Sequence, residues 1–241
     1  AGVFALGTIL GMIDQLVPNL NRVHASIEPA HLTMFLGDRI TQDTADRLKN
    51  IEGVKGVEPQ NEISVRSRLI SSEAWQPARL TMRADYEAQE YNLLQRKAGA
   101  WPHRNNIGVD IRAFQYLGLE FGDQVIFELD GTDRALPVTG SIRHHYMTSP
   151  DFGDDPAFFV DAQGLARFNI PAGEYNQLLV AIEPYSDELA RQVASEIKNR
   201  LGKEGVSVNV TFYNRPDEHW AKEFFDGLNL VLQLLALVSL F

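Results

Sequence analysis

The stretch QLLVAIEPYSDELARQVASEIKNRLGKEGVSVNVTF, residues 177–212, decides the predicted fold because it holds one complete strand–helix–strand unit. The apolar run 178–182 is typical of a buried strand, and the turn at Pro184 leads to Ser186, a residue type that caps helix N-termini. Apolar residues then recur at helical spacing, at Leu189, Val193, Ile197 and Leu201. Beyond two glycines they alternate as in a second strand, at Val206, Val208, Val210 and Phe212.

A second unit of the same kind lies earlier in the chain. Residues 32–36 alternate as in a strand, which we expect to stop at Gly37. Thr41 is placed to cap a helix that ends by Gly53, and another strand begins at Val54. Because crossovers of this kind are right-handed, both helices should cover one face of a shared sheet. The predicted fold class is therefore α+β, a split βαβ (ferredoxin-like) sandwich.

Between the two units, residues 99–146 have the pattern of an inserted, small β-rich subdomain. The segment contains a strand, a short helix, a strand, an Asp-Gly hairpin turn and a final strand, at 107–110, 112–117, 124–129, 130–131 and 136–142. Residues 147–156, MTSPDFGDDP, are a turn-rich acidic loop that leads back. We therefore predict that 26–98 and 147–215 form the α+β subdomain around this insertion.

Uncharged apolar runs occupy both ends of the chain, AGVFALGTILGMI at 1–13 and GLNLVLQLLALVSLF at 227–241. A bilayer core of roughly 30 Å needs about 20 helical residues, so each run is an incomplete span. We expect a water-exposed body cut out from between two membrane-spanning helices. Residues 1–25 are predicted to end a first transmembrane or stalk helix. The other interpretation is two ordinary terminal helices packed on the core.

The C-terminal helix is predicted to include 216–241, a stalk helix followed by the start of a second transmembrane helix. Pro216 suits the first turn of a helix, as do the two acidic residues after it, Asp217 and Glu218. The helix dipole therefore explains these carboxylates without acid–base chemistry.

Composition excludes several classes of function. The 241 residues carry a formal net charge of −10, with 32 acidic and 22 basic side chains and no clustered basic stripe, which argues against nucleic acid as a partner. The chain has no cysteine, so disulfides, thiolate catalysis and cysteine-bound metals are excluded. It also lacks a GxSxG elbow and a phosphate-binding glycine loop. We predict no enzymatic activity, no catalytic residue, no cofactor and no metal site.

Three groups of residues are candidate sites. His103, His144 and His145 could be metal ligands, but adjacent histidines in a strand point to opposite faces, and solvent-exposed loop histidines are the favoured interpretation. The acidic residues of the 147–156 loop lack EF-hand spacing and are expected to form a solvated turn; they are Asp151, Asp154 and Asp155. Trp101-Pro102 could anchor a ligand, although a Trp at a subdomain hinge is the favoured interpretation.

The order of these features resembles the extracytoplasmic domain of FtsX-like or MacB-like ABC transporter permeases along nearly the whole chain. NIEGVKGVEP, residues 50–59, is similar to the helix-to-strand junction after the first stalk. Residues 101–145 are similar to the recurring pattern of strand, short helix, Gly-Asp turn and hairpin. The matching positions are Leu117, Gly118, Leu119, Gly122, Asp123, Val138 and Gly140.

The resemblance implies a cell-membrane permease with this domain on the extracytoplasmic side, periplasmic or extracellular. It further implies a cytoplasmic ABC ATPase subunit or domain, a second permease copy, and a lipid, lipoprotein or peptide substrate or partner to which ATP-driven motion is relayed. The alternative function is an extracytoplasmic sensor or scaffold that binds and regulates a partner protein such as a cell-wall hydrolase. A third reading, a secreted metal-dependent hydrolase, needs His144 or His145 to converge with Asp151–Asp155 on one ion.

Overall fold

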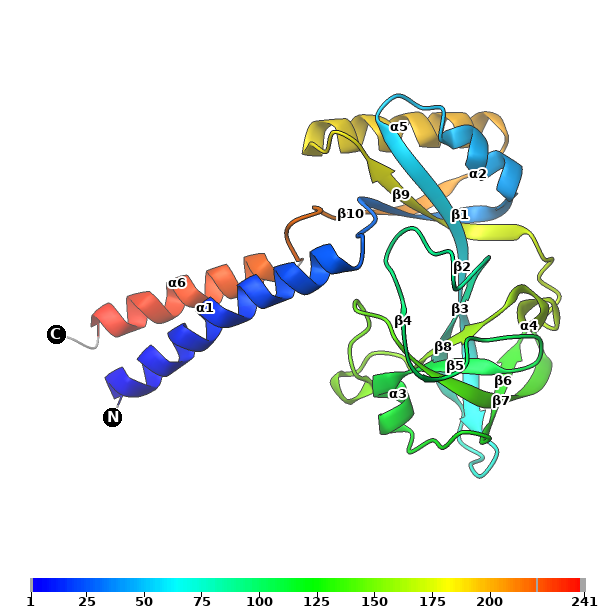
Figure 1. The fold of residues 1–241 in the computed structure, drawn as a ribbon, viewed down its shortest axis with the longest axis horizontal. Coiled ribbons are helices and arrows are strands. Elements are labelled where there is room, and N and C mark those ends of the chain that lie inside the picture. The colour runs from blue at the N-terminus through cyan, green and yellow to red at the C-terminus, as the bar shows by residue number, and fades with distance from the viewer. Residues whose placement is uncertain (1, 220, 239–241) are drawn as a thin grey trace.

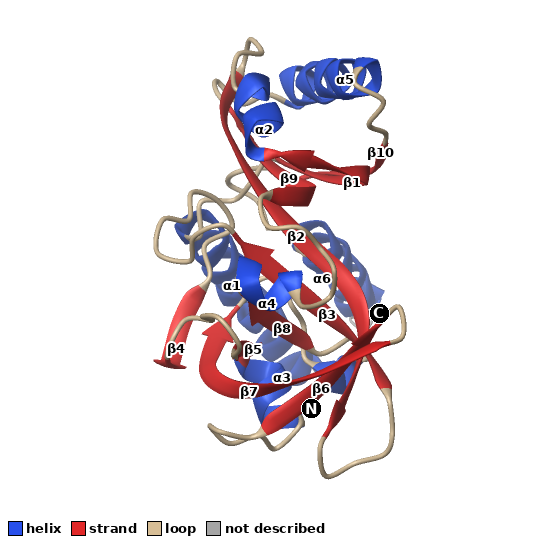
Figure 2. Ribbon diagram, turned by 90° about the vertical axis from the view of Figure 1, so that its right-hand side faces the viewer, coloured by secondary structure: helices blue, strands red, loops and turns tan. Residues whose placement is uncertain are grey.

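Figure 1 shows a computed structural model, which describes residues 2–219 and 221–238. One end of the body is built from four strands in the order β10 (Val208–Tyr213), β1 (Leu32–Thr41), β9 (Glu174–Ile182) and β2 (Val54–Leu69). Every neighbouring pair among them is antiparallel. Two helices, α2 (Gln42–Leu48) and α5 (Asp187–Lys203), cover one face of these strands (Figure 2). The predicted α+β class is confirmed.

Both predicted caps begin these helices. The Oγ1 of Thr41 accepts from the backbone N–H of Thr44 at 3.3 Å, and the Oγ of Ser186 accepts from that of Leu189 at 3.1 Å. Strand β1 does not stop at Gly37 as predicted, because a break in register between Phe35 and Ile40 lets it continue to Thr41.

The first hydrophobic core lies between these helices and the four strands. Alternate strand residues meet the apolar stripes of both helices, and the core includes Leu32, Met34, Leu178, Val180, Val193 and Ile197. All six side chains are buried. The opposite face of the same strands carries Thr33, Phe35, Gln177 and Leu179, because side chains alternate along a strand.

The sheet continues through β2 into the other end of the body. Its further strands are β3 (Gln76–Arg83), β8 (Ala157–Val160), β5 (Ile107–Asp110), β7 (Thr132–Arg143) and β4 (Gln95–Gly99), while β6 (Gln124–Leu129) pairs with β2 and β7. This end of the body also contains three short helices, α3 (Ile111–Tyr116), η1 (Pro150–Phe152) and α4 (Ala162–Ala166). The predicted strands, short helix and hairpin of 107–142 are confirmed. Asp130 and Gly131 both have positive φ, 51° and 76°, as the tight turn requires.

A second core fills this end and is not confined to the predicted insertion. It joins residues of β5, β6 and β7 to residues of β2, β3 and β8, among them Val65, Leu80, Ile107, Phe127, Leu136 and Phe158. The 16-residue strand β2 therefore contributes to both cores. The domain boundaries at 99 and 146 stay a prediction.

The terminal helices α1 (Gly2–Ser26) and α6 (Lys222–Val238) lie side by side and project from the body (Figure 1). The prediction that the last helix starts at Pro216 is wrong, because the helix begins at Lys222. Residues 216 and 217 form a bend, and Glu218 after it pairs with Arg215 at 3.0 Å. Within the described ranges, no helix has both the length and the apolar character needed to cross a bilayer.

Replacing Ser186 with Ala removes the acceptor for the backbone N–H of Leu189. We expect the free energy of unfolding, measured in urea, to fall by about 1 kcal/mol. Ser195→Ala, at an exposed position in the same helix, is the control and should leave stability unchanged or slightly raised, since Ala favours helix. Equal losses in the two variants would contradict the capping role.

Candidate functional site

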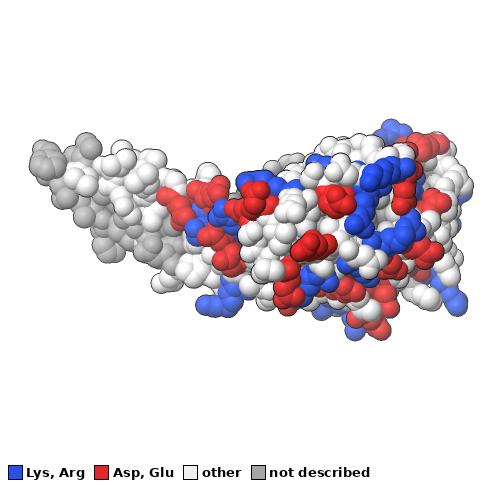
Figure 3. Space-filling model, turned by 90° about the horizontal axis from the view of Figure 1, so that it is seen from above, with Lys and Arg blue, Asp and Glu red and all other residues white. Residues whose placement is uncertain are grey.

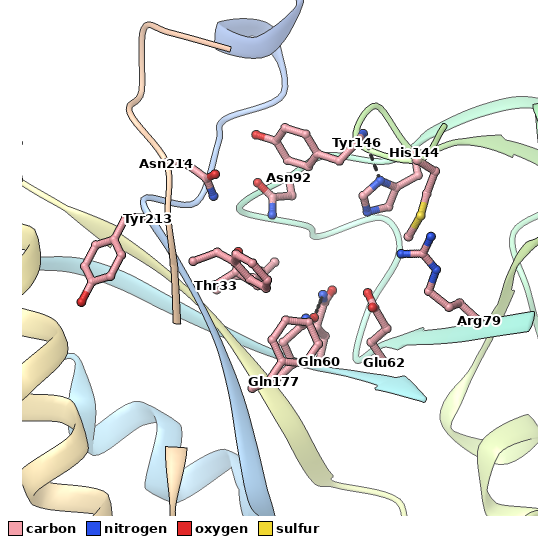
Figure 4. Close-up of a pocket in the computed structure, with 14 residues that line it drawn as sticks. Thr33, Gln60, Glu62, Arg79, Asn92, His144, Tyr146, Gln177, Tyr213 and Asn214 are labelled. Carbon is pink, nitrogen blue, oxygen red and sulfur yellow. Dashed lines mark hydrogen bonds between the residues drawn. The ribbon is translucent and has the colours of Figure 1, made fainter. Parts of the chain in front are cut away.

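A cavity of about 460 Å³ lies under the four-stranded part of the sheet, on the face away from α2 and α5. The strands form one side, and the segment after β7 that contains His144, Tyr146 and Met147 forms the other (Figure 4). The size is that of a small-molecule or short-peptide pocket. We refer to this space as the central cavity.

One wall of the central cavity is apolar and aromatic. Phe35 of β1 and Phe212 of β10 meet edge to face, with ring centroids 6.0 Å apart, and Leu179 of β9 and Met147 also line the space. Phe212 leaves more than half of its surface exposed, at 56%. Such a wall is suited to an apolar group of a ligand.

The floor of the central cavity is polar. The Gln60 side-chain amide donates to the Oε1 of Gln177, and Arg79 donates through Nη2 to the carboxylate of Asp154. Burial raises the pKa of the Glu62 carboxyl, although the positive charge of Arg79 opposes the shift. Among the described residues, the Oε1 of Gln60 and the Nε of Arg79 are buried without a hydrogen-bond partner.

His144 forms a buried part of the wall, and the prediction that it is solvent-exposed is wrong. Its ring stacks on Phe159, with centroids 6.5 Å apart, and its Nδ1 accepts from the backbone N–H of Tyr146 at 3.3 Å. Burial, with smaller contributions from the charges of Arg83 and Arg143, lowers its pKa to about 3. The ring is therefore neutral at physiological pH.

Next to the central cavity, a polar junction joins the terminal helices to the body. The His24 ring of α1 bonds through Nε2 to the carbonyl of Arg215 at 2.7 Å and through Nδ1 to the Tyr146 hydroxyl at 3.1 Å. The His219 ring lies 5.8 Å from that of His24, and its backbone N–H donates to the Oδ1 of Asn21 at 2.9 Å. These five residues are called the junction below.

Burial lowers the pKa of both junction histidines, His24 and His219. Burial also raises the pKa of the Tyr146 hydroxyl. All three groups are thus held in their neutral forms, which suits hydrogen bonding between uncharged partners.

The other sequence candidates do not gather into one site. His145 lines a separate cavity with Arg112 and Arg143, and His144 does not line that cavity. His103 is exposed and lies 3.8 Å from Asp161. Over the part of the chain that the structure describes, no three His, Asp or Glu side chains come together as a metal site.

The acidic loop is bound to the body more closely than expected. Asp154 accepts from Arg79 and from the Thr148 hydroxyl, so the prediction of a freely solvated turn is wrong for this residue, whereas Asp151 is exposed. Trp101 stacks on Tyr86 with ring centroids 5.4 Å apart.

Sequence reasoning missed the polar floor. Gln60 and Glu62 are two residues apart in β2 and so share a face, and Gln177 directly precedes an apolar strand core. The available signal was the position of Gln60 and Glu62 on one face of a strand, together with Gln177 at the edge of the apolar run 178–182. The sequence could not show that Arg79 of β3 and the segment after β7 line the same cavity as these residues.

The fold is a mixed α+β body built on one large mixed sheet. The structure is similar to the periplasmic region of MacB from Actinobacillus actinomycetemcomitans, with a TM-score of 0.50 and 13% identity over 86% of this chain and 94% of that one. The predicted resemblance of fold is thereby confirmed.

Two further solved structures are similar at lower scores. One is the extracellular domain of the noncanonic ABC-type transporter YknZ from Gram-positive bacteria, with a TM-score of 0.47 and 14% identity over 74% of this chain and all (100%) of that one. The other is a domain of a putative permease protein from Porphyromonas gingivalis, with a TM-score of 0.46 and 13% identity over 84% of this chain and 97% of that one. No family model and no curated protein matches the sequence.

The buried His144 should make stability depend on pH. The unfolded chain protonates this ring near pH 6.5, whereas the folded chain does so only near 3. The stability from the neutral ring is therefore complete above pH 6.5 and is lost as pH falls from 6.5 toward 3. His144→Asn, which keeps an acceptor near the Nδ1 position, should show a shallower loss of unfolding free energy in urea over this window.

His103→Asn, at an exposed position, is the control and should follow the wild-type pH profile. A profile for His144→Asn as steep as that of the wild type would mean that other groups account for the acid sensitivity.

Proposed function

We propose that this chain is the extracytoplasmic domain of an ABC transporter permease and that it relays ATP-driven motion from the membrane to a bound partner or substrate. The observation that carries the proposal is the connection of the terminal helices to the sheet. Helix α1 leads into β1, β10 leads toward α6, and β1 and β10 are paired neighbours. A displacement of the helix pair would therefore act on two adjacent strands together.

The contacts beside those strands support a stiff connection. Asn214 donates through its backbone N–H to the carbonyl of His31 at 2.9 Å and through Nδ2 to the carbonyl of Ala30 at 3.2 Å. The junction adds the bonds of His24 and Asn21 to the segment before α6. Packed elements joined in this way move as units and do not deform continuously.

The far part of the helix pair supports attachment to a membrane. Leu230, Leu234 and Leu237 of α6 are each more than half exposed. In Figure 3, charged side chains gather on the body and around the near end of the helices, and the described surface beyond them is uncharged. An apolar surface of this kind fits lipid or another helix. We propose that α1 and α6 are the stalks of two membrane-spanning helices.

The proposal brings with it a membrane location with this domain outside the cytoplasm, a cytoplasmic ABC ATPase subunit or domain, and a second permease copy. The body would not be an enzyme, and its cargo or partner would be a lipid, lipoprotein or peptide. We further propose that β10-β1-β9-β2 with α2 and α5 is the split βαβ (ferredoxin-like) subdomain. Because the body has two separate cores, we propose that the other subdomain extends from about residue 60 to about residue 176.

Membrane attachment can be tested with phosphatidylcholine vesicles. The chain should float with the vesicles in a density gradient, and the triple variant Leu230→Ser, Leu234→Ser, Leu237→Ser should stay in the dense fraction, because it removes the apolar surface of α6. The matched control is Ile70→Ser, Phe121→Ser, Phe152→Ser, which removes three exposed apolar residues from the body and should float like the wild type. Flotation lost equally in both variants, or absent in the wild type, would contradict the attachment.

The stiffness of the junction can be tested with spin labels, since the chain has no cysteine of its own. Cysteines at Gln15 of α1 and Ser195 of α5 give one inter-label distance, measured by pulsed electron paramagnetic resonance. The variant Tyr146→Phe with Asn21→Ala removes two junction bonds and should broaden the distance distribution.

The control pair for this measurement is Tyr116→Phe with Asn50→Ala, both at exposed positions, which should leave the distribution unchanged. A distribution as narrow in the junction variant as in the wild type would show that these bonds do not fix the helices, and the relay would lose its physical basis.

A further inference from the structure

The central cavity combines three chemical features that a single ligand would satisfy. The Oε1 of Gln60 is a buried acceptor without a partner, and the Nε of Arg79 is a buried donor without one, within the described chain. Gln60 is only 4% exposed, so its free oxygen is removed from bulk water. A buried polar atom without a partner costs free energy that a bound ligand could recover.

Glu62 adds the third feature. Its carboxyl lies beside Arg79 on the polar floor (Figure 4), and burial raises its pKa. A cationic nitrogen brought near this carboxylate would form a charge-assisted hydrogen bond in a partly desolvated place, where such bonds are stronger than in water.

The apolar wall lies next to these polar groups on the same sheet, because Phe35 pairs with Gln177 and Gln177 pairs with Gln60. Phe35, Leu179 and Phe212 present ring and aliphatic surface to the same space. The ligand must therefore carry an apolar group together with an N–H donor, an acceptor and a positive charge.

We propose that the central cavity binds the amino-terminal end of a short, extended peptide with apolar side chains. The ammonium would bind Glu62, the first peptide N–H would donate to the Oε1 of Gln60, and a peptide carbonyl would accept from the Nε of Arg79. The apolar side chains would pack on Phe35 and Phe212. A fatty acyl chain would match the apolar wall and would leave the polar floor without partners.

The position of the central cavity couples its occupant to the terminal helices. Tyr146 lines the cavity and bonds to His24 of α1, and Asn214 lines it and bonds to Ala30. An occupant that shifts either residue changes a contact that holds the helix pair. The role of the peptide as cargo or partner rests on the proposed function, whereas its binding does not.

The probe for binding is phenylalanyl-leucinamide, titrated by isothermal calorimetry, and its N-acetylated form is the uncharged comparison. The free-amine peptide should bind the wild type. Glu62→Gln should weaken this binding about ten-fold, since it removes the charge and keeps the shape, and should leave the weaker binding of the acetylated peptide unchanged. Thr33→Trp, which places a large side chain in the cavity, should abolish both.

Glu73→Gln, at an exposed position in the loop between β2 and β3, is the matched control and should bind like the wild type. Thermal unfolding followed by circular dichroism establishes that each variant is folded. Absence of binding to the wild type, equal binding of both peptides, or equal effects of Glu62→Gln and Glu73→Gln would each overturn the proposal. So would binding of oleate that Thr33→Trp blocks, without binding of either peptide.

Vesicle flotation separates this inference from the proposed function. Glu62→Gln and Thr33→Trp should float like the wild type, because neither touches α6. Peptide binding without flotation would leave the cavity assignment intact and remove the permease role. Flotation without peptide binding would leave the permease role intact and overturn the cavity assignment.

Discussion

The guanidinium of Arg83, at the end of β3, connects β2 to the segment that follows β3. Its Nη1 donates to the Oε1 of Glu58 and to the carbonyl of Tyr91, both at 2.8 Å, and its Nη2 donates to the carbonyl of Asn92 at 3.0 Å. The side chain is 1% exposed, so these bonds form away from water. Loss of one partner would leave a buried charge uncompensated, so the pair strongly favours the arrangement in which all of these bonds are made.

That arrangement fixes how the first terminal helix leaves the body. The Oδ1 of Asn92 accepts from the backbone N–H of Ala30 at 2.8 Å, and the backbone N–H groups of Asn92 and Leu93 donate to the carbonyls of Glu28 and Ile27, both at 2.8 Å. The end of α1 is therefore bound to the same loop that Arg83 holds against β2. The direction of the helix pair and the position of β2 are set by one network.

The sequence predicted what local chemistry determines and missed what long-range packing determines. Thr41 and Ser186 cap their helices as expected, and Asp130-Gly131 makes its turn, because each depends on neighbours within a few residues. The burial of His144 depends on Phe159 and Asp110, which reach it only through strand pairing. The polar floor of the central cavity was missed for the same reason, since Gln60, Arg79 and Gln177 come from three different strands.

The shared strand β2 explains why cavity and junction lie together. Its first part belongs to the core under α2 and α5, and its later part pairs with β3 and β6 in the other core. Gln60 and Glu62 lie where the strand passes from one core to the other, and neither residue belongs to either core. The central cavity lies beside them. Because β1 and β10 border the same space and lead to the helices, a change in this space acts on the segments that hold α1 and α6.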